Sequence, residues 1–161
     1  MIKIGIVPCQ NGLGHISRSI DLANRLSKRF AVFFISSSKK NKKFKINNSI
    51  KKINFVFELD LKNRKYDQLW YKKLESKIDS LNIDILISDN LPEIIFLKNK
   101  SIIISNFFWH EIFNMKNIRL KKTLEILKSK KIKIFRNKIF DDNKRFSKIG
   151  FIGGINQKKK K

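Results

Sequence analysis

The chain has 161 residues, of which 42% are hydrophobic, so its length suits one globular domain with a core and is too short for two ordinary domains. Its single cysteine, Cys9, excludes an intramolecular disulfide, and one cysteine with two histidines is a poor ligand set for a metal ion. No apolar run reaches the roughly 18 residues of a membrane span and no signal peptide precedes the first strand, so we expect a cytoplasmic protein.

A series of short, nearly continuous apolar runs predicts buried parallel strands. In chain order these runs are Ile2–Val7, Ala31–Ile35, Ile53–Leu59, Ile83–Ile87, Ile102–Ile104, Ile132–Phe135 and Phe146–Phe151. Amphipathic stretches lie between them, which indicates strands that alternate with helices.

The first predicted helix follows the first strand. Its apolar residues Ile16, Ile20 and Ala23 recur at i, i+4 and i+7, the spacing of one helical face. The stretches Tyr66–Leu81 and Asn117–Lys130 show the same periodicity. We therefore expect an α/β fold of Rossmann-like type, with a mostly parallel sheet and helices on both faces.

Two segments are expected to lie outside this regular alternation. Residues 36–49 are polar and rich in lysine, which is typical of a mobile loop. After Gly153 and Gly154 the chain ends in a lysine-rich tail. The predicted organisation is one Rossmann-like domain over residues 1–154 and a basic tail over 155–161.

The turn between the first strand and the first helix is the leading candidate site. Gly12 and Gly14 allow a ligand to approach the backbone closely, and the N–H groups at the start of the helix attract anions. His15 is a candidate general base, and Asp89, directly after a strand, is a candidate to orient its imidazole. Arg18 follows His15 by three residues and is a candidate ligand for a carboxylate or phosphate.

Each of these residues also has a purely structural interpretation. A histidine at the start of a helix, such as His15, can complete the hydrogen bonds of the helix backbone. Asp89 can begin the turn before Pro92, and Arg18 can be a solvated helix residue. The turn is not a dinucleotide fingerprint, because Ser17 replaces its third glycine and residues 36–38 are serines where a ribose-binding acid would stand. This argues against an NAD enzyme, and no cofactor is predicted.

The formal net charge of +24 admits two explanations. Lysine, asparagine, isoleucine and phenylalanine are all abundant, which is typical of the codon bias of an AT-rich genome, and the lysines are scattered along the chain. The alternative is attraction to an anionic membrane surface or to a phosphorylated substrate. No nucleic-acid motif organises the charge, so no specific nucleic acid is expected.

Several stretches together resemble a known family. Residues Gly12–Arg18 and Leu22–Leu26 are similar to the opening of two-domain GT-B glycosyltransferases, and most of all to the family-28-like group that includes the N-acetylglucosaminyl transferase forming lipid II. Asp84–Asp89 resembles the "D-x-x-x-S-D" strand end of that group. Ser105–Trp109 resembles the "T/S-N-F-x-W" stretch of glycosyltransferase-like domains that carry the G-x-G-H-x-x-R loop. Ile149–Gly154 is similar to the link between the two halves of these proteins.

The resemblance implies roles for individual residues. His15 would deprotonate an acceptor hydroxyl with Asp89 as its partner, and the loop around Gly12 and Gly14 would contact acceptor and phosphate. Arg18, Asn106 and Trp109 complete the expected substrate-binding set. The family binds its nucleotide sugar mainly through a second Rossmann-like domain, which we expect a partner to supply.

The sequence therefore predicts the acceptor-binding half of a glycosyltransferase, which would receive a nucleotide sugar from a partner donor-binding domain. Three alternatives stay open: a nucleotide-sugar hydrolase that uses water as acceptor, a non-catalytic binding or scaffold subunit, and a truncated remnant. Peripheral contact with an anionic membrane on its cytoplasmic side is a further expectation.

Overall fold

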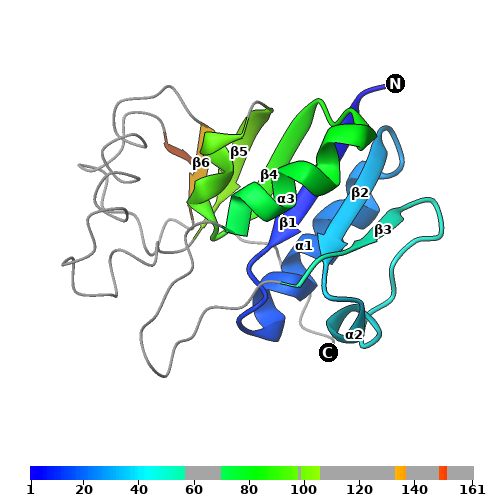
Figure 1. Cartoon of the computed structure of the whole chain (residues 1–161). Coiled ribbons are helices and arrows are strands. Elements are labelled where there is room, and N and C mark those ends of the chain that lie inside the picture. Colours follow the sequence, from blue (N-terminus) through cyan, green and yellow to red (C-terminus); the bar gives the residue numbers. More distant parts are fainter. Residues whose placement is uncertain (57–69, 98, 106–132, 137–148, 152–161) are drawn as a thin grey trace.

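The computed structural model describes residues 1–56, 70–97, 99–105, 133–136 and 149–151. These residues form a seven-stranded sheet in the order β3-β2-β1-β4-β5-β6-β7, and every neighbouring pair of strands is parallel. Helices cover both faces of the sheet (Figure 1). The predicted Rossmann-like α/β class is confirmed.

The elements alternate along the chain much as the apolar runs predict. The strands are β1 (Lys3–Pro8), β2 (Ala31–Ser36), β3 (Lys51–Asn54), β4 (Ile85–Asp89), β5 (Lys100–Ile104), β6 (Lys133–Arg136) and β7 (Ile149–Phe151). The helices are α1 (Leu13–Leu26), α2 (Ser38–Asn41) and α3 (Trp70–Ile78), with 3-10 turns η1 (Asp79–Leu81) and η2 (Pro92–Phe96). In this part of the chain no helix is both long enough and apolar enough to span a bilayer.

Helix α1 packs on one face of the sheet through the predicted stripe. Ile16, Ile20 and Ala23 are all buried, and they join Ile6 of β1 and Phe34 of β2 in one apolar cluster. Because alternate residues of a strand point to opposite faces, the neighbours of these strand residues serve the other face.

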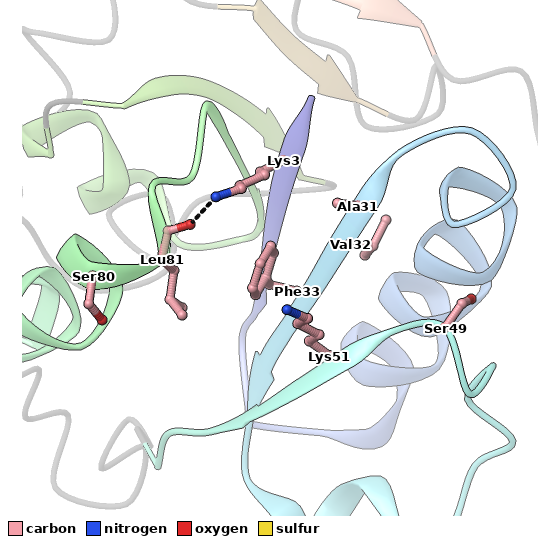
Figure 2. Close-up of a pocket in the computed structure, with 8 residues that line it drawn as sticks. All are labelled: Lys3, Ala31, Val32, Phe33, Ser49, Lys51, Ser80 and Leu81. Carbon is pink, nitrogen blue, oxygen red and sulfur yellow. Dashed lines mark hydrogen bonds between the residues drawn. The ribbon is translucent and has the colours of Figure 1, made fainter. Parts of the chain in front are cut away.

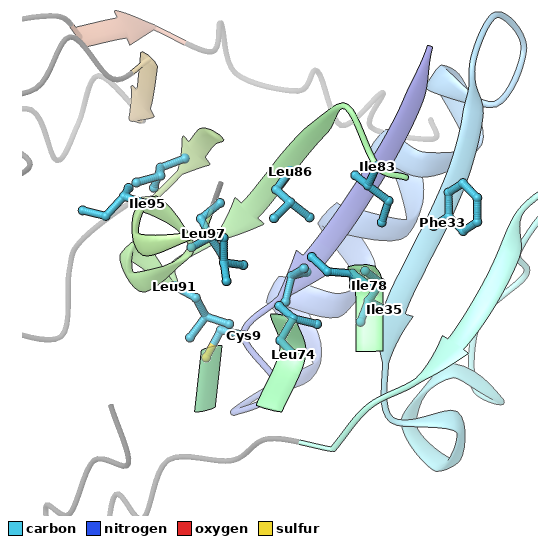
Figure 3. Close-up of a cluster of buried hydrophobic side chains, with 13 residues drawn as sticks. Cys9, Phe33, Ile35, Leu74, Ile78, Ile83, Leu86, Leu91, Ile95 and Leu97 are labelled. Atoms are coloured by element: carbon cyan, nitrogen blue, oxygen red, sulfur yellow. The ribbon is translucent and has the colours of Figure 1, made fainter. Parts of the chain in front are cut away.

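The second face is covered by α3 and the turns η1 and η2 (Figure 3). Leu74 and Ile78 of α3 pack on Phe33 and Ile35 of β2 and on Leu86 of β4. Both faces of the central strands are therefore buried, which explains why their sequences read as continuous apolar runs and not as alternating ones.

Gly5 allows close packing on this second face. A Cβ atom at this position would lie 2.8 Å from Cδ2 of Leu86 and 3.0 Å from Cδ1 of Ile83. Ile83 lies before β4, and Leu86 is fully buried within it. The glycine therefore lets side chains from the β4 region lie directly against β1.

The strand boundaries differ from the predicted ones where register decides them. The predicted strand Ile83–Ile87 is shifted to Ile85–Asp89, because β4 pairs with β1 from Ile4↔Ile85 to Pro8↔Asp89. β3 starts at Lys51 and ends at Asn54, opposite the last residue of β2, and not at Leu59. Residues 57–59 and the predicted helix 117–130 lie outside the described residues, as does residue 152 onward.

The prediction of a plain loop over residues 36–49 was wrong in its first part. Residues Ser38–Asn41 form α2, and the Oγ atom of Ser36 donates a hydrogen bond to Oδ1 of Asn41 over 2.6 Å. Ile46 is also buried, in the cluster beneath α1. The segment was predicted to be a loop because its many lysines make it polar, and its polarity does not reveal the residues that anchor it.

Candidate active site

The site lies at the carboxyl ends of β1 and β4. The strand order runs outward from these two neighbours in opposite directions, so the chain reverses its direction of strand addition here. In open parallel sheets this switch point is where ligands bind. Pro8 at the end of β1 pairs with Asp89 at the end of β4, and the backbone N–H of Cys9 donates to the carbonyl of Asp89 over 2.8 Å.

Three predicted residues meet at this point. The Nδ1 atom of His15 lies 2.8 Å from Oδ1 of Asp89. Arg18 donates to both oxygens of the same carboxylate, from Nε to Oδ2 over 2.7 Å and from Nη2 to Oδ1 over 2.7 Å. The structure thus brings His15, Arg18 and Asp89 together. Two side chains that lie one turn apart on α1 bind the same carboxylate at the end of β4.

The carboxylate is the buried member of this cluster. The Asp89 side chain is 2% exposed, whereas His15 is 15% and Arg18 is 25% exposed. The hydrogen bond from Arg18 to Asp89 raises the pKa of the guanidinium above its usual value, and this effect and the charge of Asp89 outweigh the lowering by burial. Arg18 is therefore charged throughout the working range of pH, and the buried carboxylate has a permanent cation beside it.

The geometry assigns different tasks to the two nitrogens of His15. A proton on Nδ1 satisfies Asp89, and in the neutral imidazole this leaves Nε2 as the nitrogen that accepts a proton. Nη2 of Arg18 lies 3.3 Å from the same Nδ1. The carboxylate is thus shared between an imidazole and a guanidinium, which holds its oxygens in one orientation.

The glycine turn opens next to this cluster. Gly12 caps α1 with φ of 107°, a backbone conformation that favours glycine. A Cβ atom at Gly12 or Gly14 would meet no atom of the described residues within 4 Å, so this part of the chain leaves space open above the turn. The first turn of α1 contains no acidic residue, and Leu13 is 46% exposed beside it. The turn leaves room for a ligand at the start of the helix, and its role in binding stays a prediction.

A buried polar network beside Asp89 was not predicted from the sequence. Asn90 adopts a left-handed conformation with φ of 66° and accepts a hydrogen bond from Oγ of Ser105 over 2.7 Å. Its backbone N–H donates to the carbonyl of Ile104, and Oγ of Ser88 donates to the carbonyl of Val7. The available signal was an asparagine directly after a strand, since asparagine tolerates this conformation. The network joins the ends of β1, β4 and β5.

Other predicted site residues cannot be placed relative to this cluster. Asn106 and Trp109 lie outside the described residues, which end on this stretch at the buried Ser105.

At the end of β1, Nε2 of the buried Gln10 donates to the carbonyl of Phe55 over 2.7 Å, and the backbone carbonyl of Gln10 accepts from Nζ of Lys40. These contacts fix the chain between β1 and the glycine turn.

Comparison with known proteins gives a likeness of fold. No family model matches the sequence, and no curated protein matches it. Among solved structures, UGT2 of Phytolacca americana, in complex with UDP-2fluoro-glucose and pterostilbene, aligns with a TM-score of 0.50 at 18% identity and covers 65% of this chain. UGT73P12 of Glycyrrhiza uralensis, complexed with glycyrrhetinic acid 3-O-monoglucuronide, aligns with a TM-score of 0.45 at 11% identity over 66% of this chain.

The likeness concerns a part of these larger proteins. This chain spans 30% of the Phytolacca chain and 29% of the Glycyrrhiza chain. At such identities the alignment with the Phytolacca enzyme speaks for the fold alone. The parallel sheet with helices on both faces is a Rossmann-like arrangement, and the likeness supports the fold of a GT-B glycosyltransferase for this chain.

Proposed function

We propose that this chain is the acceptor-binding half of a glycosyltransferase that takes its sugar from a nucleotide-sugar donor. The observation that carries the proposal is the contact of 2.8 Å between His15 and Asp89 at the switch point of the sheet. A histidine held by a buried carboxylate is the arrangement that general-base catalysis needs near neutral pH.

The proposed reaction is a displacement at the anomeric carbon of the donor. An acceptor hydroxyl forms the new glycosidic bond while the bond to the nucleotide diphosphate breaks, and the hydroxyl proton passes to Nε2 of His15. The negative charge of Asp89 stabilises the imidazolium that forms, and Arg18 keeps that carboxylate in place. The helix start at Gly12 and Gly14 offers backbone N–H groups to acceptor or phosphate.

The proposal assigns donor binding to a partner domain. The glycine turn and the "D-x-x-x-S-D" strand end resemble the family-28-like group, which includes the lipid II-forming transferase. This resemblance supports the proposal that the chain takes part in the same kind of sugar transfer. Asn106 and Trp109 belong to the proposed acceptor contacts through the same resemblance.

Sugar transfer tests this proposal. The chain is combined with a candidate donor-binding domain, and transfer from a labelled nucleotide sugar to an acceptor is followed by product analysis. We expect His15→Ala to lower kcat by about 10²- to 10⁴-fold, because the base is removed. Asp21→Asn, on the exposed side of α1, is the control for Asp89→Asn, and only the latter is expected to impair transfer.

The products separate this proposal from its alternative. A glycoside as product supports transfer, whereas free sugar as the only product supports a nucleotide-sugar hydrolase. A competent assembly in which His15→Ala is as active as the unchanged chain would overturn the role of His15 in both reactions.

Peripheral contact with an anionic membrane is the second part of the proposal, and the net charge of +24 supports it. We expect the chain to float with vesicles of phosphatidylglycerol and phosphatidylcholine at low salt, but not with phosphatidylcholine alone. High salt should release it, because exposed charges are screened. His15→Ala should bind these vesicles normally, and absence of binding at low salt would contradict the membrane contact.

A further inference from the structure

A cavity of about 240 Å³ opens at the opposite edge of the sheet from the candidate active site (Figure 2). It lies where β1, β2 and β3 begin. Lys3 pairs with Ala31, and Phe33 pairs with Lys51, so these four residues stand side by side on three neighbouring strands. The cavity therefore has a floor of strand residues and is separate from the chemistry proposed above.

Two lysines supply the charge of this cavity. Nζ of Lys3 donates to the carbonyl of Leu81 over 3.2 Å, which leaves two of its three N–H donors for other partners. Nζ of Lys51 lies 5.5 Å from the centroid of the Phe33 ring, so the ring holds this ammonium at the cavity. Figure 2 shows both side chains on either side of Phe33.

No carboxylate neutralises these lysines among the described residues. The ion pairs found there involve only Asp89 and Asp21 as acids. Oδ2 of Asp84 accepts the backbone N–H of Lys3 over 2.8 Å, and Asp84 does not line the cavity. The lining that the described residues give this cavity therefore contains two ammonium groups and no carboxylate.

Two serines add neutral hydrogen-bonding groups to the lining. Ser49 precedes β3 and Ser80 belongs to η1, so they reach the cavity from two different segments. A hydroxyl both donates and accepts, and its donor can serve an anion. The remaining lining, which includes Phe33 and Leu81, is apolar and suits the body of a small organic molecule.

We propose that this cavity binds a small phosphate-bearing anion, either inorganic phosphate or a phosphate monoester. Two positive groups complement the double negative charge of phosphate, and the serine hydroxyls complement its oxygens. The volume lies below the roughly 300 Å³ at which ordinary ligand pockets begin, so a whole nucleotide sugar is too large for it.

Titration calorimetry at fixed ionic strength tests the proposal, with inorganic phosphate and glucose 1-phosphate as separate probes. The double variant Lys3→Met/Lys51→Met removes both charges of the cavity. Lys28→Met/Lys43→Met is the matched control, since it removes the same charge from exposed positions that do not line the cavity. Thermal unfolding of both variants verifies that they are folded.

We expect saturable binding to the unchanged chain, at least tenfold weaker binding to Lys3→Met/Lys51→Met, and less than a twofold change in the control. Tighter binding of glucose 1-phosphate would identify a monoester as the ligand, and equal or tighter binding of phosphate would identify the free anion. Equal losses in both double variants would overturn the proposal in favour of diffuse attraction by the net charge. Absence of saturable binding would overturn it as well.

His15→Ala keeps this test independent of the proposed transferase activity. Because the cavity and the His15 cluster lie at opposite edges of the sheet, the variant should bind phosphate as tightly as the unchanged chain. If His15→Ala abolished binding while Lys3→Met/Lys51→Met retained it, the phosphate would belong to the candidate active site and the cavity would be excluded.

Discussion

Asp89 is a buried carboxylate whose partners both come from one turn of α1. Arg18 contributes two hydrogen bonds of 2.7 Å, and His15 contributes one contact of 2.8 Å. A charge that is 2% exposed depends on such partners, because water cannot replace them without opening the structure. The same contacts that serve the proposed chemistry therefore also stabilise the fold.

Replacement of Arg18 by methionine measures this contribution. We expect Arg18→Met to lower the free energy of unfolding by about 3 kcal/mol, since it leaves a buried carboxylate with His15 as its remaining partner at this end of α1. Arg18→Lys should lose less than Arg18→Met, because lysine keeps a positive charge, although as a point charge it cannot replace both hydrogen bonds of the two-pronged guanidinium. Urea unfolding monitored by circular dichroism gives both values.

A second arginine of the same helix provides the control. Arg25 pairs with Asp21 over 3.1 Å, but these side chains are 67% and 47% exposed. Arg25→Met is therefore expected to cost no more than about 0.5 kcal/mol. Equal losses in Arg18→Met and Arg25→Met would contradict a structural role of the buried pair.

The stability that Arg18 contributes has a defined dependence on pH at alkaline pH. The pKa of Arg18 is raised, so its stabilisation is fully present below the pKa of an arginine in the unfolded chain and is lost only as pH rises through the still higher pKa of the folded state. The difference in stability between the unchanged chain and Arg18→Met should hence stay constant between about pH 7 and pH 10. A loss of the difference over that range would contradict the assignment.

At the scale of elements, two glycines with different surroundings test the packing of the sheet. Gly5→Ala places a methyl group 2.8 Å from the fully buried Leu86, and we expect a loss of about 1 to 3 kcal/mol from overpacking. The methyl group of Gly14→Ala meets no atom within 4 Å in the part of the chain that the structure describes, and alanine is a better helix former in α1, so a gain of up to about 1 kcal/mol is expected. Urea unfolding measures both.

Gly14→Ala also tests the glycine turn as a binding element. If a ligand approaches the backbone at this position, the variant should be more stable and yet bind acceptor more weakly. A variant that gains stability and transfers sugar normally would restrict the role of Gly14 to structure.

The periodicity of the sequence was sufficient to predict the elements that build the core. The face of α1 with Ile16, Ile20 and Ala23 is buried as the spacing predicts, because a helix on a sheet hides one stripe of side chains. Strand limits were less predictable, since β4 ends at Asp89 through its register with β1 and not through its composition. The helical turn α2 depends on the Ser36–Asn41 contact, which no periodicity reveals.

The meeting of His15, Arg18 and Asp89 was predictable from the sequence, but their contacts were not. The spacing of His15 and Arg18 placed them on one side of a helix, and the strand end placed Asp89 at the same edge of the sheet. That Arg18 binds Asp89 on both oxygens depends on how α1 lies over β1 and β4, which local sequence does not encode. Asn90 was missed for the same reason, because its partner Ser105 lies directly after β5, the neighbouring strand of the sheet.

At the scale of the whole molecule, the charge of +24 acts on stability. Repulsion among like charges destabilises the compact state, and the Debye length falls from about 30 Å at 0.01 M salt to about 8 Å at 0.15 M. We expect this increase in sodium chloride to stabilise the chain by about 1 kcal/mol, or about 3 °C in Tm. Differential scanning calorimetry measures the change.

A variant with less charge controls for other effects of salt. Lys28→Glu/Lys43→Glu changes two exposed residues and lowers the net charge by about four, so it should be more stable at low salt and gain less from added salt. An equal gain in both proteins would show that the salt acts through something other than the repulsion.

The contacts of His15 and Arg18 with Asp89 can form only late in the synthesis of the chain. Arg18 and its carboxylate are separated by 71 residues, and at 5–20 residues per second the ribosome needs about 4 to 14 seconds to supply the second after the first. During that interval the start of α1 is a cationic end without its counter-ion. A chaperone or an anionic surface that binds the nascent chain would therefore contact His15 and Arg18 before β4 has been added to the sheet and Asp89 is in place.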